Sequence, residues 1–528
     1  MASLIRLNAS KSLCAIALLV STLSGCGATG GVGEAAWPPL GKKWYERADA
    51  SFHHGDMEDA REAIDNALKV VPDRPEARLL SAKVALASLD YDRVQASLRG
   101  LDTSEARSLR GRAFWYAGEV EKAADELEKL LSDPEVRDPW ANEIAKLARV
   151  GAGRKPFDLA GGMLASTEMP RAGTSALIVP LELNGEPALG LVATGTAEAV
   201  IDSSAGARPS WVSLRFGERL EVRDVPVLAK DLSGISRQVN APIKILLGVN
   251  LLRHLRPTFD FAGGQFVVRS FDPPPPPVAT TIKLSYVRGG GMLVRGAFGA
   301  DQAAPACSLL VDTALTYPLA LSNEGWKKAG VSPASLQAVP GAGDLREGVL
   351  PMLRLGAYDV PKVPGLGGES AVKEREEGLG IALDGLIGSG LLASFRVTLV
   401  DGGRTMWLED IPAEALNAPS LFANLPPVEE APDAEVTEPE NGKPGKGAPA
   451  KPGKPAPGGA APAPAPAPAK PPAAPGAAPA GTKPPAASGN VPAAGAKPPA
   501  APNPAPAAAT KPPAAAPANP APAKGTKP

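Results

Sequence analysis

The stretch Leu309-Leu310-Val311-Asp312-Thr313-Ala314 carries an apolar run into an aspartate and a threonine, and Leu386-Ile387-Gly388 follows later in the chain. The same order occurs earlier, where Ala193-Thr194-Gly195 is followed by Leu246-Leu247-Gly248. Short apolar strand pairs and a closing Gly-Gly turn also recur, so that six features match in the same order. This repetition predicts an internal duplication of one β unit, with its copies at 172–272 and 280–412.

Each unit has the patterning of antiparallel sheet. Beyond Phe157 the apolar residues recur with period two and turn residues interrupt the runs. The run at 177–183 leads through Asn184-Gly185, a strong hairpin signal, into the run at 188–192. The prolines of a segment at 273–279 stiffen the connection between the units into an extended spacer.

This layout resembles the retropepsin-like aspartyl proteases, once in each unit, and implies a pepsin-like body of two lobes that share a cleft. In that family an apolar strand carries Asp-Thr-Gly to a sharp loop. A later apolar-apolar-Gly segment passes beneath the loop, since glycine permits a close approach of two backbones. Leu246-Leu247-Gly248 and Leu386-Ile387-Gly388 keep this second feature.

The first feature is degenerate in both units. The family's chemistry needs two facing carboxylates that share a proton, one to activate water and one to protonate the leaving group. Alignment of the units puts Ala193, Thr194 and Gly195 in the first catalytic position, and Asp312 with Thr313 in the second. The resemblance therefore implies a body that has lost one catalytic aspartate.

Two other roles for Asp312 remain open. The residue could serve as a hydrogen-bond anchor of its loop, or two chains could pair their second lobes and bring two copies of Asp312 together. No cofactor and no metal site are expected, because the β region shows no nucleophile motif, no Cys/His cluster and no regularly spaced acidic loop.

The N-terminus reads as a processing signal. Arg6 and Lys11 precede a short apolar core at 13–20, and Leu23-Ser24-Gly25-Cys26 follows. This segment resembles the lipobox of bacterial lipoproteins, which implies removal of residues 1–25 and acylation of Cys26. Acyl chains would anchor the protein to a membrane of the bacterial cell envelope. The alternative is a signal that is cleaved without lipidation.

Glycine at position 27, after the acylated cysteine, favours the outer membrane over the inner membrane by resemblance to enterobacterial sorting. The mature chain would keep one thiol, Cys307, which lies in an apolar run and is expected to be buried and inert.

After a linker at 26–40, residues 41–150 have helical periodicity with small residues at regular places. The first set resembles a tetratricopeptide repeat and comprises Trp44, Ala48, Gly55, Ala60, Ile64, Ala67, Leu68 and Pro72. A weaker copy follows thirty-four residues later, and a third arrives about five residues early. An ordinary helical bundle is the alternative. Repeats of this kind commonly expose a surface for a peptide or a protein partner.

The C-terminal segment, 426–528, consists mainly of Pro, Ala, Gly and Lys and contains no aromatic residue, so we expect it to be disordered. Residues 441–528 hold ten lysines and no acidic residue. Since the whole chain has a net charge of −1, the remaining residues together carry a net charge of −11. An acidic body argues against nucleic-acid binding. The tail is expected to contact an anionic cell-wall polymer or to act as a spacer.

The predicted fold class is multidomain, with tetratricopeptide-like helices, then an all-β bilobal retropepsin-like body, then the tail. The leading functional hypothesis is a lipid-anchored envelope protein that binds peptides or proteins without cleaving them. An aspartic endopeptidase that acts through Asp312, by homodimerisation if required, and a structural envelope scaffold are the alternatives.

Overall fold

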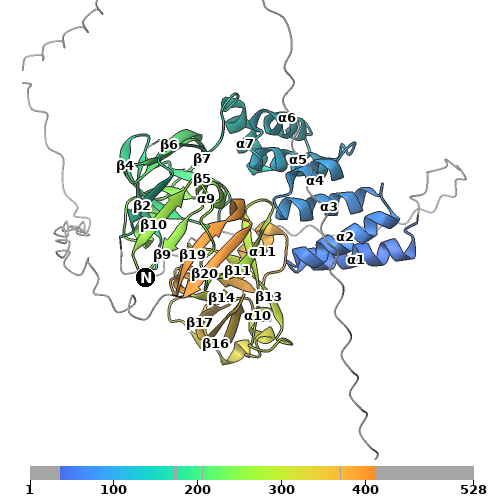
Figure 1. Cartoon of the computed structure of the whole chain (residues 1–528). Coiled ribbons are helices and arrows are strands. Elements are labelled where there is room, and N and C mark those ends of the chain that lie inside the picture. The colour runs from blue at the N-terminus through green and yellow to red at the C-terminus, as the bar shows by residue number, and fades with distance from the viewer. Residues whose placement is uncertain (1–35, 171–174, 205, 369, 411–528) are drawn as a thin grey trace, which may run out of the picture. The chain divides into compact units, whose positions relative to one another are not determined.

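The computed structural model describes residues 36–170, 175–204, 206–368 and 370–410. A helical region is followed by a β-rich body, as the sequence predicted (Figure 1). The expectations for the signal segment 1–25, for Cys26 and for the tail 426–528 fall outside the described residues.

Antiparallel helix pairs make up the helical region, and Figure 1 shows them in blue, one pair after another. Small side chains permit close packing, since Ala48, Ala60 and Ala67 are all fully buried between α1, α2 and their neighbours. The helices are α1 (Pro39–His53), α2 (Met57–Val70), α3 (Pro75–Ala87), α4 (Tyr91–Ser97), α5 (Ser104–Tyr116), α6 (Val120–Leu131) and α7 (Pro139–Val150).

The turn within each pair has a left-handed residue, at Gly55 (φ 72°), Leu89 (φ 56°) and Gly118 (φ 78°). The first two turns are followed by an N-capping aspartate, Asp56 or Asp90, whose side chain accepts a backbone N–H of the next helix. These three turns are 34 and then 29 residues apart, so the third helix pair comes about five residues earlier than a regular repeat would place it.

The first lobe is a closed sheet in the order β6-β7-β5-β8-β4-β3, with β3 returning to β6. Asn184 and Gly185 both have positive φ and form the predicted hairpin turn between β3 and β4. The strands are β3 (Ile178–Leu183), β4 (Glu186–Val192), β5 (Ala199–Asp202), β6 (Ser210–Phe216), β7 (Leu220–Lys230) and β8 (Ile243–Leu247), with β1 (Asp158–Gly161) added beside β7 and helices α8 (Ser233–Gln238) and α9 (Val249–Leu255).

The second lobe repeats this arrangement, in the order β16-β17-β14-β18-β13-β12 with β12 returning to β16. Each strand pair has the same direction as its counterpart in the first lobe, including the parallel pairs β13–β18 and β14–β17. The elements are β12 (Gly291–Ala297), β13 (Ala306–Val311), β14 (Leu319–Leu321), β15 (Gln337–Ala338), β16 (Arg346–Leu355), β17 (Tyr358–Gly367) and β18 (Gly385–Ile387), with α10 (Asn323–Lys328), η1 (Pro333–Ser335), α11 (Ser370–Leu379) and α12 (Ser389–Leu392). The structure thus shows the duplication that the sequence predicted.

A sheet built from both lobes joins them, in the order β11-β20-β19-β9-β10-β2. At its centre β9 pairs with β19, and Thr258 Oγ1 lies 2.9 Å from Thr398 Oγ1. The lobes are therefore joined through hydrogen-bonded strands as well as through the proline segment 273–279. The elements are β2 (Leu164–Glu168), β9 (Thr258–Asp260), β10 (Gln265–Arg269), β11 (Thr280–Val287), β19 (Phe395–Val400) and β20 (Thr405–Asp410), with η2 (Asp401–Gly403) between the last two.

Strands β1 and β2 precede residue 172, where the sequence analysis began the first lobe. In β2 only Ala165 is buried, while Leu164 is exposed, so the strand lacks a clear period-two apolar pattern. Its partner β10 positions it in the shared sheet, and that long-range pairing has no local signal.

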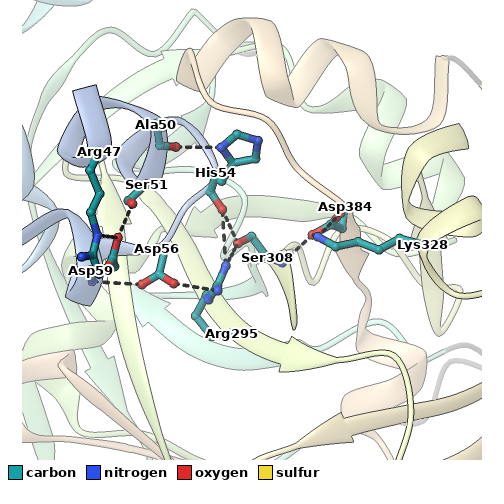
Figure 2. A network of polar contacts seen from close by, with 10 residues as sticks. All are labelled: Arg47, Ala50, Ser51, His54, Asp56, Asp59, Arg295, Ser308, Lys328 and Asp384. Atoms are coloured by element: carbon teal, nitrogen blue, oxygen red, sulfur yellow. Dashed lines mark hydrogen bonds and ion pairs between the residues drawn. The ribbon is translucent and has the colours of Figure 1, made fainter. Parts of the chain in front are cut away.

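The α1–α2 turn contacts the second lobe directly (Figure 2). Ser308 Oγ donates to the carbonyl of His54 over 2.6 Å, and Arg295 forms an ion pair with Asp56 at 2.8 Å. A Cβ on Gly55 would lie 2.8 Å from Ser308 Oγ. The turn edge of the helical region is thus fixed on the β body. None of the described helices is both long and apolar enough to cross a membrane.

We predict that Gly55→Ala lowers the thermal midpoint more than Gly100→Ala. Both glycines have similar left-handed φ, 72° and 76°, so each substitution incurs about 1 kcal/mol of backbone strain. A new methyl group at position 100 meets nothing within 4 Å, whereas at position 55 it meets Ser308. Overpacking should add about 1 to 3 kcal/mol at position 55 alone. Equal midpoints by circular dichroism would contradict the contact between turn and lobe.

Candidate functional site

The two loops that the sequence aligned as catalytic meet at the junction of the lobes. Thr194 and Thr313 lie there 119 positions apart in sequence and are both buried. The backbone N–H of Thr194 donates to Thr313 Oγ1 over 3.1 Å, and the N–H of Thr313 donates to Thr194 Oγ1 over 3.0 Å. Each hydroxyl also donates to a carbonyl of the opposite lobe, Val311 or Val192. We call these four hydrogen bonds the threonine interlock.

Each loop rests on the apolar-apolar-Gly strand of its own lobe. The N–H of Ala193 donates to Leu247 at 3.1 Å, and the N–H of Asp312 donates to Ile387 at 2.9 Å. A Cβ on Gly248 would lie 2.2 Å from the carbonyl oxygen of Glu198, and one on Gly388 would lie 1.9 Å from that of Tyr317. No side chain fits at either glycine, which accounts for the motif in both lobes.

Asp312 is the carboxylate at this junction and is 3% exposed. Its Oδ1 accepts the N–H of Ala314 over 3.1 Å. Gly195 of the first lobe lies against it, because a Cβ there would come within 2.5 Å of the same oxygen. Its Oδ2 forms an ion pair with Arg375 Nη2 at 2.7 Å. The first-lobe position that matches Asp312 is Ala193, which is buried and carries no titratable group.

Helix α11 supplies Arg375, and the first lobe has only the shorter helix α8 at the corresponding place between strands. A catalytic dyad needs two carboxyl groups that exchange one proton. Here the charged neighbour of Asp312 is a guanidinium, which offers N–H donors and does not give up a proton in proteins. The arrangement holds the Asp312 carboxylate in place beside a cation and not beside a second carboxyl group.

A second buried carboxylate, Glu198, connects the first-lobe loop to the helical region. It is 6% exposed and accepts three hydrogen bonds from side chains of α5 and α7: Trp115 Nε1 at 3.3 Å, Tyr116 OH at 3.1 Å and Trp140 Nε1 at 3.2 Å. Burial raises the pKa of Glu198, and the three donors and Arg112 oppose that shift. The helical region thus holds the loop that carries Thr194.

A cavity of about 620 Å³ opens beside Gly195 and Arg375. Its walls come from α5, the start of α7, the first-lobe loop, the β11–β12 hairpin and α11. Glycines form part of the wall, since a Cβ on Gly290 would lie 2.3 Å from the Cβ of Ala197. The helices and both lobes all contribute to this space.

Two other side chains of the β body, those of Cys307 and His254, pack against their neighbours in the fold. Cys307 is buried in β13, and burial raises the pKa of its thiol to about 12. Burial lowers the pKa of His254 to about 3, and its ring stacks on Phe157 at 4.4 Å. Across the described ranges no group of three or more His, Cys, Asp or Glu side chains could hold a metal ion.

Sequence reasoning did not identify Arg375 or Glu198. Arg375 lies in the charged run Lys373-Glu374-Arg375-Glu376-Glu377, which has the composition of a solvated helix. Glu198 lies among small and apolar residues. The one local sign of its role is that an acidic residue directly precedes the apolar strand β5. Its aromatic partners lie 58 to 83 positions away, so no local pattern could reveal them.

No family model matches the chain, and no curated protein matches it. The chain is similar to many solved structures, among them the following three. A retropepsin-like aspartic protease from Rickettsia conorii is 18% identical over 25% of this chain and 90% of its own, with a TM-score of 0.19. Basic 7S globulin from soybean is 11% identical over 48% and 95%, with a TM-score of 0.31. An aspartic proteinase from Irpex lacteus is 11% identical over 48% and 99%, with a TM-score of 0.34. Structural neighbours of this chain are thus aspartic proteases of the retropepsin-like and pepsin-like kinds.

We predict a specific pH dependence for Glu198→Gln. The raised pKa of Glu198 means that the folded state binds the proton more tightly than the unfolded state. Its contribution to stability is present below the ordinary value of 4.5 and is lost as the pH rises through the raised pKa. The thermal midpoint of the wild type should therefore fall relative to that of Glu198→Gln as the pH rises above 4.5.

The difference between the two midpoints is the quantity to follow, because the substitution also removes a hydrogen-bond acceptor at every pH. Thermal unfolding at stepped pH measures it. A difference that stays constant over the whole range would contradict a raised pKa at Glu198.

Proposed function

We propose that this chain is an aspartyl protease-like protein that binds peptides or proteins and does not cleave them. The observation that carries the proposal is the pairing of Asp312 with Arg375 opposite Ala193. The body keeps two lobes and a cavity, but no described carboxylate lies at the position where it could share a proton with Asp312. Binding is the use of the site that needs none of the missing groups.

The homodimer alternative is disfavoured by the threonine interlock. A second chain could bring its own Asp312 to this site only if Thr313 left Thr194 and if β19 left β9. That separation would leave the hydroxyl and the N–H of Thr194 without their partners in the second lobe, at about 1 to 3 kcal/mol for each buried group. The second lobe already has its partner in the first lobe of the same chain.

The helical region is proposed as a tetratricopeptide-like interaction module. Its support is the recurring helix pair with a left-handed turn residue and a buried alanine seam. Because Glu198 and Ser308 fix this region to the β body, we expect a ligand to be shared between helices and lobes.

The location is proposed from the sequence alone. Cys26 would carry acyl chains and anchor the chain in the bacterial cell envelope, at the outer membrane in preference to the inner membrane. The lysine-rich tail would contact an anionic cell-wall polymer. A structural scaffold remains the alternative to ligand binding.

A cleavage assay tests the proposal. The full-length chain, purified in detergent, is incubated with a peptide library from about pH 3 to about pH 8 beside Asp312→Ala, and products are read by mass spectrometry. We expect no cleavage above the Asp312→Ala background, because one carboxylate paired with a guanidinium cannot act as acid and base together.

The matched control is Asp301→Ala, which removes an exposed aspartate from the same lobe. Acid-optimal cleavage that persists in Asp301→Ala and vanishes in Asp312→Ala would establish the endopeptidase and overturn the proposal. If neither cleavage nor saturable peptide binding were detected, the structural scaffold would be the remaining hypothesis.

A further inference from the structure

The cavity beside Gly195 is lined by four arginines: Arg112, Arg137, Arg288 and Arg375. Two acidic side chains, Asp138 and Glu374, also line it, so cations outnumber anions in its wall. At about 620 Å³ the cavity lies within the range of pockets that hold small ligands or a few residues of a peptide. The excess of positive charge favours an anionic ligand.

Three of these arginines are already engaged. Arg112 lies 3.8 Å over the ring of Trp140 and 3.6 Å from Asp138. Arg375 pairs with Asp312, and Arg137 donates to backbone carbonyls of its own loop.

Arg288 differs from Arg112 and Arg375. Its Nη1 donates to the carbonyl of Gly378 over 2.9 Å, and it has no ion pair with any residue in the described ranges. Burial lowers the pKa of Arg288, and the neighbouring charge of Arg112 lowers it further, while Asp138 opposes the shift. A guanidinium has five N–H donors in a planar fork that fits a carboxylate. Arg288 is exposed, and its remaining N–H donors have no acceptor among the described residues.

The rest of the cavity wall consists of apolar side chains and of glycines, which have no side chain. Tyr116, Trp140 and Leu379 present apolar surface to the cavity. Gly290 and Gly195 add no side chain, and larger residues there would collide with Ala197 or Asp312. The cavity thus offers a cation next to a hydrophobic wall, which suits a carboxylate and an apolar side chain on one short peptide.

We infer that this cavity binds short acidic peptides, with a ligand carboxylate on Arg288 and an apolar ligand side chain against Leu379 and Trp140. The inference rests on the proposed non-cleaving, peptide-binding function and names the class of peptide. Electrostatic attraction to the cluster of arginines would speed association and make the affinity fall as salt is added.

Fluorescence anisotropy on the full-length chain in detergent tests this. The probe is a labelled peptide of one leucine and four glutamates, and its control is the same peptide with glutamines. We expect the glutamate peptide to bind more tightly, and Arg288→Gln to weaken it by about tenfold through loss of a charge-assisted hydrogen bond. The control Arg219→Gln removes an exposed arginine from the turn between β6 and β7 and should leave binding unchanged. The lysine-rich tail is the same in all these proteins, so it cannot account for a difference between them.

A second variant removes space instead of charge. Gly378 of α11 lines the cavity, and a Cβ there would meet no atom within 4 Å. Gly378→Leu should therefore fill part of the cavity, weaken binding by about tenfold or more, and keep the fold, because leucine favours a helix more than glycine does. Gly234→Leu is its control, since that glycine lies in α8 of the first lobe and is equally free of neighbours.

The outcomes separate the two claims. Equal affinity for the glutamate and glutamine peptides, or full affinity in folded Arg288→Gln and Gly378→Leu, would overturn the acidic-peptide site and leave non-cleaving peptide binding standing. Absence of binding for both probes would overturn the acidic-peptide site, and cleavage of either probe would overturn the proposed function itself.

Discussion

Two threonine side chains hold the centre of this molecule together. Each hydroxyl in the interlock accepts a backbone N–H from the other loop and donates to a carbonyl of the other lobe. The shared sheet repeats this pairing at a second place, where Thr258 meets Thr398 between β9 and β19. Since both lobes have the same strand order, these two contacts lie where equivalent residues of the two halves face each other. A buried hydroxyl or N–H without a partner is costly, so the lobes stay joined through these groups.

The position of every functional group follows from that junction. The interlock sets Ala193 and Asp312 in equivalent places on either side of it, and the charged partner that reaches Asp312 is Arg375 from α11. The helical region then holds the first-lobe loop through the three donors on Glu198, and its α1–α2 turn contacts Ser308 of the second lobe. Beside this junction lies the cavity that Arg288 and Arg375 help to line.

The sequence predicted those features that have a local cause. Positive φ at Asn184 and Gly185 follows from a strong hairpin signal, and the motif glycines Gly248 and Gly388 lie where no Cβ fits. The helix pairs follow from regular spacing, including the shorter second interval. Features that depend on distant partners could not be predicted in this way. Arg375 belongs to a charged helix whose pattern is that of a solvent-exposed face, and the placement of β2 depends on β10 about a hundred positions away.

Hydrogen exchange at the amides of Thr194 and Thr313 tests the account most directly. Each of these N–H groups donates to the other residue's hydroxyl, so both become accessible to solvent only when the lobes separate. The account predicts that the two amides, in different lobes, are equally protected from exchange and that destabilising conditions accelerate them together. Rapid exchange at both amides under native conditions would show that the second lobe is free to leave the first, and would reopen the pairing of two copies of Asp312.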